Sequence, residues 1–137
     1  GKIKHKKSYN GPWVIYYKNG QTEFKGNLKE GKKDGIFKRY NKKGILLEET
    51  NWKKGEELGV KYYDKKGILY DEYIWKSPTH TSYLYKLYNK DGNIQTEGMY
   101  IKGKKNGTWK YFIPLEDGSV KLEKKIVYQN GKKIKEF

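Results

Sequence analysis

The sequence predicts an all-β fold: an elongated, single-layer antiparallel sheet of successive β-hairpins, with about ten strands and no helix. Three observations indicate this fold. Glycine-centred turn signals recur at short, regular intervals, and the runs between them alternate aromatic with charged residues. A long phrase also recurs: residues 16–40 read YYKNGQTEFKGNLKEGKKDGIFKRY, and residues 88–112 read YNKDGNIQTEGMYIKGKKNGTWKYF.

Glycines mark the start of most copies of this phrase. Gly11, Gly35 and Gly59 lie 24 residues apart, Gly107 opens the last copy, and a fourth copy begins near Tyr83 without a glycine. The repeats span approximately residues 11–34, 35–58, 59–82, 83–106 and 107–133 of a single repeat domain, residues 1–137, with a basic leader at residues 1–8. Stacked hairpins bury a shared strip that none could bury alone.

Each repeat is expected to hold two turns. The first turns are Asn19-Gly20, Lys43-Gly44, Lys66-Gly67, Asp91-Gly92 and Asp117-Gly118, and the second turns are Glu30-Gly31, Lys54-Gly55, Lys102-Gly103 and Asn130-Gly131. Asn-Gly and Asp-Gly favour two-residue type I′ turns, in which both central residues take positive φ. In the third repeat, residues 76–82 with Pro78 replace the second turn, either as a tolerated insertion or as a kink that shapes a partner site.

Two-residue first turns fix the register of the strands, and the charges agree with that register. In three repeats a lysine falls opposite a glutamate: Lys38–Glu49, Lys61–Glu72 and Lys86–Glu97. Each such pair contributes roughly 0.2–1 kcal/mol. The terminal repeats depart from the pattern, because Val14 faces Lys25 in the first and Lys110 faces Lys125 in the lengthened fifth.

Alternation assigns the side chains to two faces. The aromatic face carries two columns: Trp13, Phe37, Val60, Tyr85 and Trp109, and then Leu28, Trp52, Trp75, Tyr100 and Tyr128. Gly26 and Gly98 stand opposite Trp13 and Tyr85, where a ring can lie across the bare backbone. The other face, which we call the tyrosine face, is expected to be wet and carries the Lys–Glu pairs. The aromatic columns form either the core or a stacking platform for single-stranded nucleic acid or sugars.

The net charge of +15 leaves two interpretations open. Of 31 basic residues only Arg39 is arginine, the residue that reads bases and phosphates in a bidentate manner, so sequence-specific recognition of nucleic acid is not expected. The lysines reflect either the codon bias of an AT-rich genome, with a solvated surface, or selection for an anionic partner.

No motif in the sequence predicts catalysis. There is no cysteine, and His5 and His80 lack partners at metal-ligand or triad spacing, so both are expected to be exposed loop residues. Three acidic pairs occur, Glu48-Glu49, Glu56-Glu57 and Asp71-Glu72. Neighbours along a strand point to opposite faces, unlike the paired carboxylates of a glycosidase. We therefore predict a protein that is not an enzyme and that uses neither a metal nor a cofactor.

Two sets of residues are candidate binding groups. The tyrosine face presents amphipathic side chains of the kind enriched at protein interfaces: Tyr16, Tyr40, Tyr63 and Tyr88. The Gly-Lys-Lys corners at residues 31–33, 103–105 and 131–133 are either turns with solvated lysines or weak anion sites formed by Lys32, Lys33, Lys104, Lys105, Lys132 and Lys133. A stripe of such lysines would attract anionic lipid by about 1 kcal/mol per residue.

The phrase GxWxxYxxxGxxxxEGxYxxGKxxG, in residues 83–107 and approximately in residues 11–35, resembles the MORN repeat. It is most similar to the bacterial variant called the YwqK-type antitoxin-like family, and the resemblance covers residues 9–133. This resemblance implies a single-layer sheet of hairpins. It also implies a role in scaffolding, in oligomerisation or in contact with acidic phospholipids.

The sequence thus predicts a non-enzymatic binding or scaffold module of a bacterial MORN-like repeat protein. It would contact an unidentified protein partner through its aromatic or tyrosine-rich surface, and neutralising a toxin by direct contact would be a special case. The alternative is peripheral binding to anionic membrane lipids or polyanions through the lysine-rich turns; self-association is also open. The chain begins at Gly1 rather than Met, and an exported or cell-surface setting is favoured over a cytoplasmic one.

Overall fold

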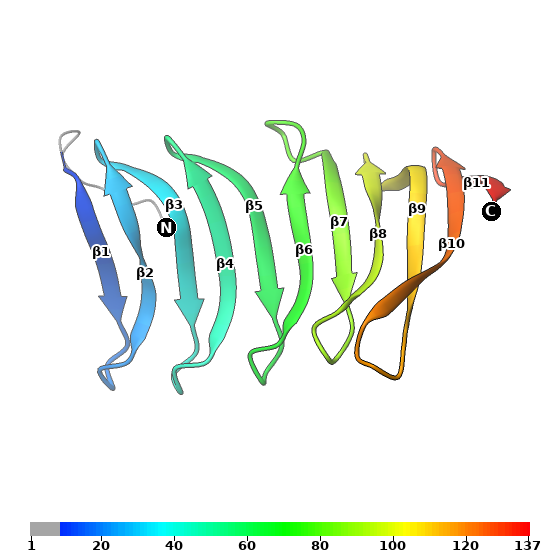
Figure 1. The fold of residues 1–137 in the computed structure, drawn as a ribbon. Coiled ribbons are helices and arrows are strands. Elements are labelled where there is room, and N and C mark those ends of the chain that lie inside the picture. Colours follow the sequence, from blue (N-terminus) through cyan, green and yellow to red (C-terminus); the bar gives the residue numbers. More distant parts are fainter. Residues whose placement is uncertain (1–8) are drawn as a thin grey trace. The chain divides into compact units, whose positions relative to one another are not determined.

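The computed structural model describes residues 9–137, which form strands and turns but no helix (Figure 1). The predicted leader, residues 1–8, and His5 lie outside the described residues. Within the described part there is no helix long and apolar enough to cross a membrane. The chain divides into two compact units, Gly1–Gly67 and Ile68–Phe137. The single repeat domain expected from the sequence stays a prediction.

Each unit is an open antiparallel sheet in which every strand pairs with its neighbours in the sequence. The first unit contains β1 (Gly11–Tyr16), β2 (Thr22–Lys29), β3 (Lys32–Tyr40), β4 (Leu46–Lys53) and β5 (Glu56–Tyr63). The second contains β6 (Leu69–Trp75), β7 (Ser82–Tyr88), β8 (Ile94–Ile101), β9 (Lys104–Pro114), β10 (Val120–Gln129) and β11 (Lys132–Glu136).

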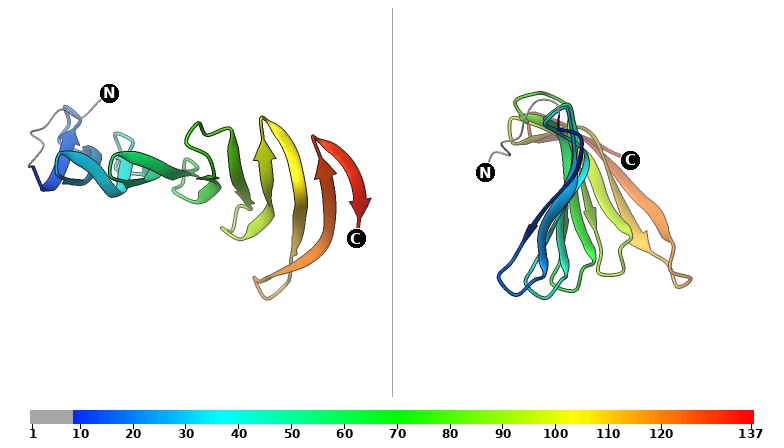
Figure 2. Two further views of the ribbon diagram at one scale, coloured as in Figure 1. Left: turned by 90° about the horizontal axis from the view of Figure 1, so that it is seen from above. Right: turned by 90° about the vertical axis from the view of Figure 1, so that its left-hand side faces the viewer.

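The predicted fold class is confirmed: the protein is all-β and is built of successive antiparallel hairpins. Both units are single layers, because within each unit no described element covers either face of the strands (Figure 2). Residues 9–137 contain eleven strands rather than about ten, because the residues after the Asn130-Gly131 turn form β11.

The first turns are not the two-residue type I′ turns that the sequence suggests. Between β3 and β4 the Gly44 amide donates to the Asn41 carbonyl (3.0 Å) and the Asn41 amide donates to the Ile45 carbonyl (2.9 Å), which defines a three-residue loop. Only Gly44 has a positive φ, of 84°. The Asn41 side-chain oxygen also accepts from the Lys43 and Ile45 amides. An asparagine or aspartate at the first position and a glycine at the fourth therefore specify this turn in the three middle repeats, whereas the first and last turns begin with Tyr17 and Leu115 and carry Asn19 and Asp117 at the third position.

Type I′ geometry occurs at the second turns instead. Both residues have positive φ at Glu30-Gly31, Lys54-Gly55, Lys102-Gly103 and Asn130-Gly131. The turns also dock on the preceding hairpin: the Gly55 amide donates to the Lys33 carbonyl (2.9 Å), and the Gly131 amide donates to the Lys105 carbonyl (2.8 Å). These bonds fix the backbone at Lys33 and Lys105.

The predicted register is nevertheless right, because a β-bulge compensates for the longer first turn. Tyr40 pairs with Leu46, one residue out of the predicted register, and the bulge next to this pair restores it. Four predicted pairs are confirmed: Val14–Lys25, Lys38–Glu49, Lys86–Glu97 and Lys110–Lys125. The pair Lys61–Glu72 would join residues of different units and stays a prediction.

The loop at residues 76–82 closes the β6–β7 hairpin without interrupting it. Pairing continues up to Trp75–Tyr83, and the Lys76 amide donates to the Ser82 carbonyl (2.8 Å). His80 takes the positive φ, 59°, that glycine takes in the other turns. Pro78 therefore lies outside the ladder, where its missing amide proton leaves no gap.

The aromatic face holds the buried apolar side chains of each described unit. These are Leu28, Phe37 and Val60 in the first unit and Trp109 and Ile126 in the second. All except Ile126 belong to the predicted columns. In the second unit the rings touch from strand to strand, as for Tyr100 and Trp109, whose centroids lie 4.9 Å apart with the rings at 77°.

The expectation of a wet tyrosine face needs correction in the second unit. Ile74, Leu84 and Met99 are cross-strand partners on that face, and each is half-buried. In the first unit the equivalent positions include the exposed Asn27 and Asn51. The two units therefore share a backbone pattern but present different second faces.

Gly26 and Gly98 lie opposite Trp13 and Tyr85 as predicted, but the ring above each glycine comes from the other neighbouring strand. A Cβ at Gly26 would lie 2.5 Å from ring carbons of Phe37, and a Cβ at Gly98 would overlap the indole of Trp109. Neither glycine has a positive φ. The close approach of a ring, and not the backbone conformation, is what requires glycine here.

We expect Gly98→Ala to lower the free energy of unfolding by about 3 kcal/mol, because the methyl group would force Trp109 from its place. Gly118→Ala is the control, since Gly118 has open space around it but a φ of 88°, and it should cost only about 1 kcal/mol. Urea unfolding followed by tryptophan fluorescence measures both. Equal losses would show that ring packing over Gly98 does not matter.

Candidate functional site

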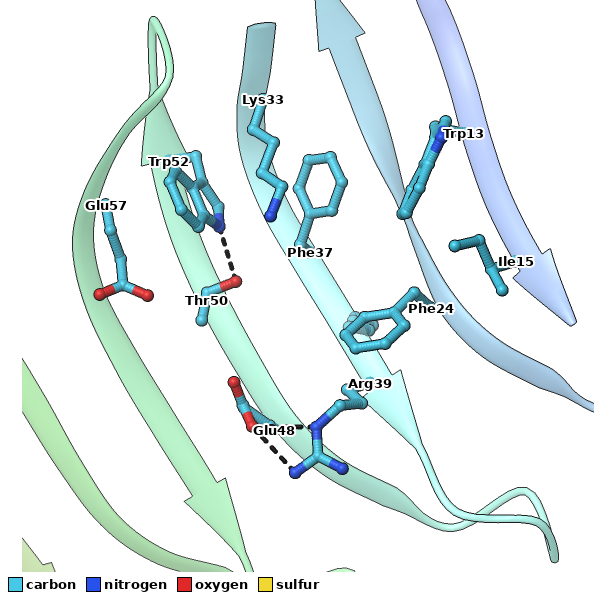
Figure 3. A pocket seen from close by; sticks show the side chains of 11 residues that line it. Trp13, Ile15, Phe24, Lys33, Phe37, Arg39, Glu48, Thr50, Trp52 and Glu57 are labelled. Carbon is cyan, nitrogen blue, oxygen red and sulfur yellow. Dashed lines mark hydrogen bonds and ion pairs between the residues drawn. The ribbon is translucent and has the colours of Figure 1, made fainter. Parts of the chain in front are cut away.

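The aromatic face of the first unit contains a hollow of about 260 Å³ (Figure 3). Its walls are the rings of Trp13, Phe24, Phe37 and Trp52, which come from four successive strands. Phe37 is buried, while the other three rings are half-buried. The hollow thus presents partly uncovered aromatic surface in a single-layer sheet.

Lys33 reaches over these rings instead of extending into solvent. Its Nζ lies 4.4 Å from the ring centroid of Trp52 and 5.3 Å from that of Phe37, within cation–π range. Burial lowers the pKa of Lys33 from its usual 10.5, although the nearby carboxylates of Glu57 and Glu48 act to raise it. The ammonium group is therefore incompletely compensated for the water it has lost.

Arg39 and Glu48 form the polar end of the hollow. Nε and Nη2 of Arg39 each lie 3.0 Å from Oε2 of Glu48. Beside them the Trp52 indole N–H donates to the Thr50 hydroxyl at 2.7 Å (Figure 3). These contacts hold the planar guanidinium of Arg39 and the indole of Trp52 in defined orientations.

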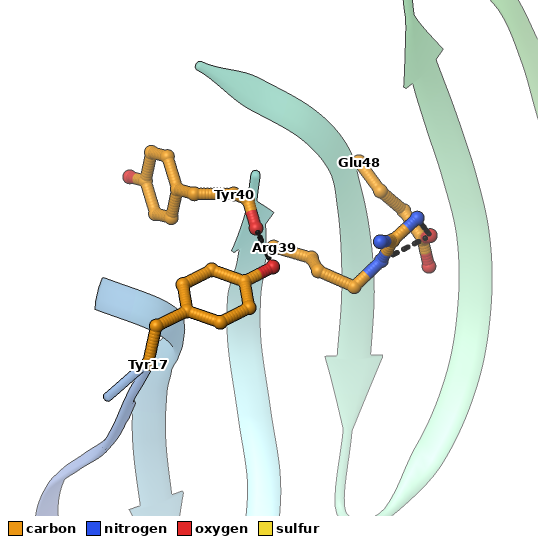
Figure 4. A network of polar contacts seen from close by, with 4 residues as sticks. All are labelled: Tyr17, Arg39, Tyr40 and Glu48. Atoms are coloured by element: carbon orange, nitrogen blue, oxygen red, sulfur yellow. Dashed lines mark hydrogen bonds and ion pairs between the residues drawn. The ribbon is translucent and has the colours of Figure 1, made fainter. Parts of the chain in front are cut away.

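A second polar contact anchors the same region of β3. The Tyr17 hydroxyl donates to the backbone carbonyl of Tyr40, the residue after Arg39, at 2.6 Å (Figure 4). The Asn19 side chain likewise donates to the Lys42 carbonyl at 2.9 Å. These bonds tie the tip of the first hairpin to that of the second, so the strands that carry the hollow are fixed against each other.

The second unit repeats the folded-back lysine. Lys105 follows its turn as Lys33 does, and its Nζ lies 4.8 Å from the ring centroid of Trp109, 5.1 Å from that of Tyr128 and 5.8 Å from that of Tyr111. The same nitrogen lies 3.3 Å from the Tyr111 hydroxyl. The folded-back lysine thus occurs once in each unit.

The centre of this second arrangement is filled. Where Phe37 pairs with Thr50 in the first unit, Trp109 pairs with Ile126 in the second. Trp109 is 1% exposed and Ile126 is 7% exposed. Both larger side chains are buried, whereas Thr50 at the position equivalent to Ile126 is only half-buried, so this pair leaves less open surface than Phe37 and Thr50 do.

The six candidate anion-binding lysines fall into two groups. The second lysine of each corner is engaged: Lys33 and Lys105 contact rings, and Lys133 pairs with Glu136 at 2.6 Å. The first lysines, Lys32, Lys104 and Lys132, are exposed. In the first unit, Lys32 borders an open hollow of about 550 Å³ that is also lined by Lys29, Lys53, Lys54, Glu30 and Asp34. Anion binding by the six stays a prediction.

The four candidate protein-binding tyrosines differ in exposure. Tyr16 is 62% exposed, whereas Tyr40, Tyr63 and Tyr88 are half-buried. The Tyr63 hydroxyl donates to Glu49, the Tyr88 hydroxyl donates to Glu72 (3.0 Å), and Nζ of Lys25 lies 5.5 Å from the Tyr40 ring centroid. Burial, together with the Glu72 carboxylate, raises the pKa of Tyr88. Their role in binding stays a prediction.

Two polar groups are more buried than their types usually are, and only for His80 did the sequence predict otherwise. Asp71 is buried; Tyr85 donates to its Oδ2 (3.0 Å), and its Oδ1 has no hydrogen bond within the described part of the chain. Burial raises the pKa of Asp71, against the hydrogen bonds from Tyr85 and Tyr73. His80, expected to be exposed, is half-buried. Its ring stacks on that of Trp75, with the ring centroids 4.2 Å apart and the ring planes at 5°.

The carboxylates of the acidic pair Glu48-Glu49 lie on opposite faces, as the sequence predicts. Glu48 lies on the aromatic face with Arg39, while its neighbour Glu49 lies on the tyrosine face with Tyr63. No group of three or more histidine, aspartate or glutamate side chains within residues 9–137 is placed to hold a metal ion. Aromatic surface edged by charged hydrogen-bonding groups is typical of binding pockets.

No protein-family model matches the chain, and no curated protein is significantly similar to it. The resemblance to MORN repeats therefore stays an expectation, carried by the repeated phrase and consistent with the hairpin architecture.

We expect Lys33→Met to raise the stability of the fold at neutral pH. The folded-state pKa of Lys33 is below its unfolded value, so burying the ammonium destabilises the fold while both states are protonated. This penalty fades as pH rises through the folded pKa, so the advantage of the variant should shrink by about pH 11. Urea unfolding at about pH 7 and about pH 11 measures the difference.

Lys133→Met is the matched control, because Lys133 occupies the same corner position but its pKa is raised by Glu136. Its stabilising contribution is present below the unfolded pKa and is lost as pH rises, so this variant should be no more stable than the wild type at neutral pH. Equal behaviour of the two variants would contradict the inference for Lys33.

Proposed function

We propose that the chain is a non-enzymatic binding module of a bacterial MORN-like repeat protein, and that it contacts a partner protein through the tyrosine face. The observation that carries the proposal is the way the tyrosines are held. Tyr63 and Tyr88 are each fixed by a hydrogen bond to a carboxylate while part of the ring remains accessible.

Such fixed rings are good anchors for a protein partner. A tyrosine whose side-chain conformation is set before binding loses little entropy on association, and it offers both apolar surface and a polar tip. Lys25 and Lys38 pair directly with each other on the same face, and only Lys38 has an acidic cross-strand partner, Glu49. This combination favours a partner surface with acidic groups around an apolar centre.

We expect Tyr63→Ala to weaken binding of the partner by about 2 kcal/mol, or roughly 30-fold, as at a hot spot. Tyr62→Ala is the matched control, since Tyr62 is the neighbouring residue on β5, is 40% exposed and points to the aromatic face. Proteins captured by the wild type but not by Tyr63→Ala would be purified and their affinities measured at low and physiological salt. An equal loss in both variants would refute contact through the tyrosine face.

A second candidate function, peripheral binding to anionic lipid, is favoured by one specific feature. The second-turn end of the first unit gathers Lys29, Lys32, Lys53 and Lys54 around one open hollow. Lysines grouped in this way attract an anionic surface, and the attraction falls with salt.

For the lipid function we expect Lys53→Glu/Lys54→Glu to abolish co-sedimentation with phosphatidylserine vesicles, because charge reversal replaces attraction by repulsion. Lys42→Glu/Lys43→Glu is the control: it makes the same change in net charge at the opposite end of the hairpins. Both pairs and the wild type are compared on anionic and neutral vesicles at several salt concentrations. Equal loss in both variants would indicate attraction by net charge alone.

A further inference from the structure

The hollow on the aromatic face of the first unit is a candidate site of its own. It lies on the side of the sheet opposite the tyrosine face, so the proposed protein contact does not use it. It is also not required by the fold, because the second unit builds the same strands with two larger, buried side chains, Trp109 and Ile126, at the pair equivalent to Phe37 and Thr50.

The polar groups at the hollow also differ between the units. At the pair where the first unit has Arg39 and Glu48, the second has Tyr111 and Lys124, whose Nζ lies 5.6 Å from the Tyr111 ring centroid. Arg39 is the only arginine of the chain. A chain that uses lysine everywhere else thus places its one planar, five-donor cation at this hollow.

The charges around the hollow balance. Lys33 and Arg39 are positive, and Glu48 and Glu57 are negative. Lys38 also borders the hollow, but it pairs with Glu49 and so belongs to the tyrosine face. A cationic ligand would meet Lys33 and Arg39, and an anionic ligand would meet the two carboxylates. A purely apolar ligand would remove water from Arg39 and Glu48 without replacing its hydrogen bonds.

We propose that this hollow binds a neutral sugar ring in the pyranose form. The C–H faces of a pyranose are apolar and can pack on the half-buried rings of Trp13, Phe24 and Trp52. Its hydroxyl groups both donate and accept, so they suit Glu48 and Arg39, which remain partly exposed although they pair with each other. A hollow of about 260 Å³ has room for one such ring.

The test is a titration of the whole chain followed by NMR of the tryptophan indole N–H groups. The probes are methyl glucopyranoside, methyl galactopyranoside and methyl N-acetylglucosaminide, at up to about 50 mM to cover millimolar dissociation constants. We expect the Trp13 and Trp52 signals to shift in a saturable way, while those of Trp75 and Trp109 in the second unit stay in place. Linear oligosaccharides of the same sugars form a second arm: tighter binding would indicate a glycan chain, and equal binding a free sugar.

Thr50→Ile is the decisive variant, because it places in the hollow the residue that fills it in the second unit. It should keep the fold and weaken binding of the sugar at least about tenfold. Asn51→Ile adds the same side chain to the opposite face of β4 and should leave binding unchanged. Arg39→Lys keeps the charge but removes the planar donors, and it should weaken binding as well.

Several outcomes would overturn the proposal. These are the absence of a shift with every sugar, equal shifts at all the tryptophans, and unchanged binding by Thr50→Ile. Tetramethylammonium and benzoate serve as charged probes, and a saturable shift with either one, but with no sugar, would show that the ligand is an ion. None of these results bears on the tyrosine face, so the protein-binding proposal stands or falls separately.

Discussion

The structure depends on one constraint: each sheet is a single layer, so a side chain is covered only by its neighbours on the same face. Neither unit contains a second layer in the described residues, and only five apolar side chains there are buried. Stability must then come from contacts between adjacent hairpins, as in other repeat proteins. Gly26 and Gly98 answer this constraint directly, because a glycine lets the ring from the next strand lie flat on the backbone.

Part of the lysine content has the same cause. Lys33 and Lys105 lay their stems and ammonium groups over rings that nothing else would cover. The sequence left two interpretations of the lysines open, a solvated surface and selection for an anionic partner. The structure adds a third role, which is to cover aromatic rings. Lys33 and Lys105 shield the aromatic face from water, and the partial burial that results lowers the pKa of Lys33. On the tyrosine face, Tyr63 likewise lies over a neighbouring strand, where its hydroxyl group donates a hydrogen bond to Glu49.

Strand order, register and columns could be predicted because they follow from a period of two and from cross-strand charge pairs. Turn types could not, since glycine occurs in both kinds of turn and the deciding residue, such as Asn41, stands two positions before the dipeptide considered. The side-chain conformations of the lysines could not be predicted from the neighbouring residues in the sequence. Gly-Lys-Lys occurs at residues 103–105 and 131–133, yet Lys105 contacts rings and Lys133 contacts Glu136. The difference is set by the neighbouring strand.

Because each repeat must satisfy the same packing, similarity between repeats reflects the fold, and function has to be sought where equivalent positions differ. Thr50 is half-buried where the second unit buries Ile126, and Arg39 with Glu48 stand in place of Tyr111 with Lys124. Open aromatic surface is costly in a sheet with so little burial. A hollow that lies where the second unit buries larger side chains, and that carries the only arginine of the chain, is therefore better explained by a ligand than by a defect of packing.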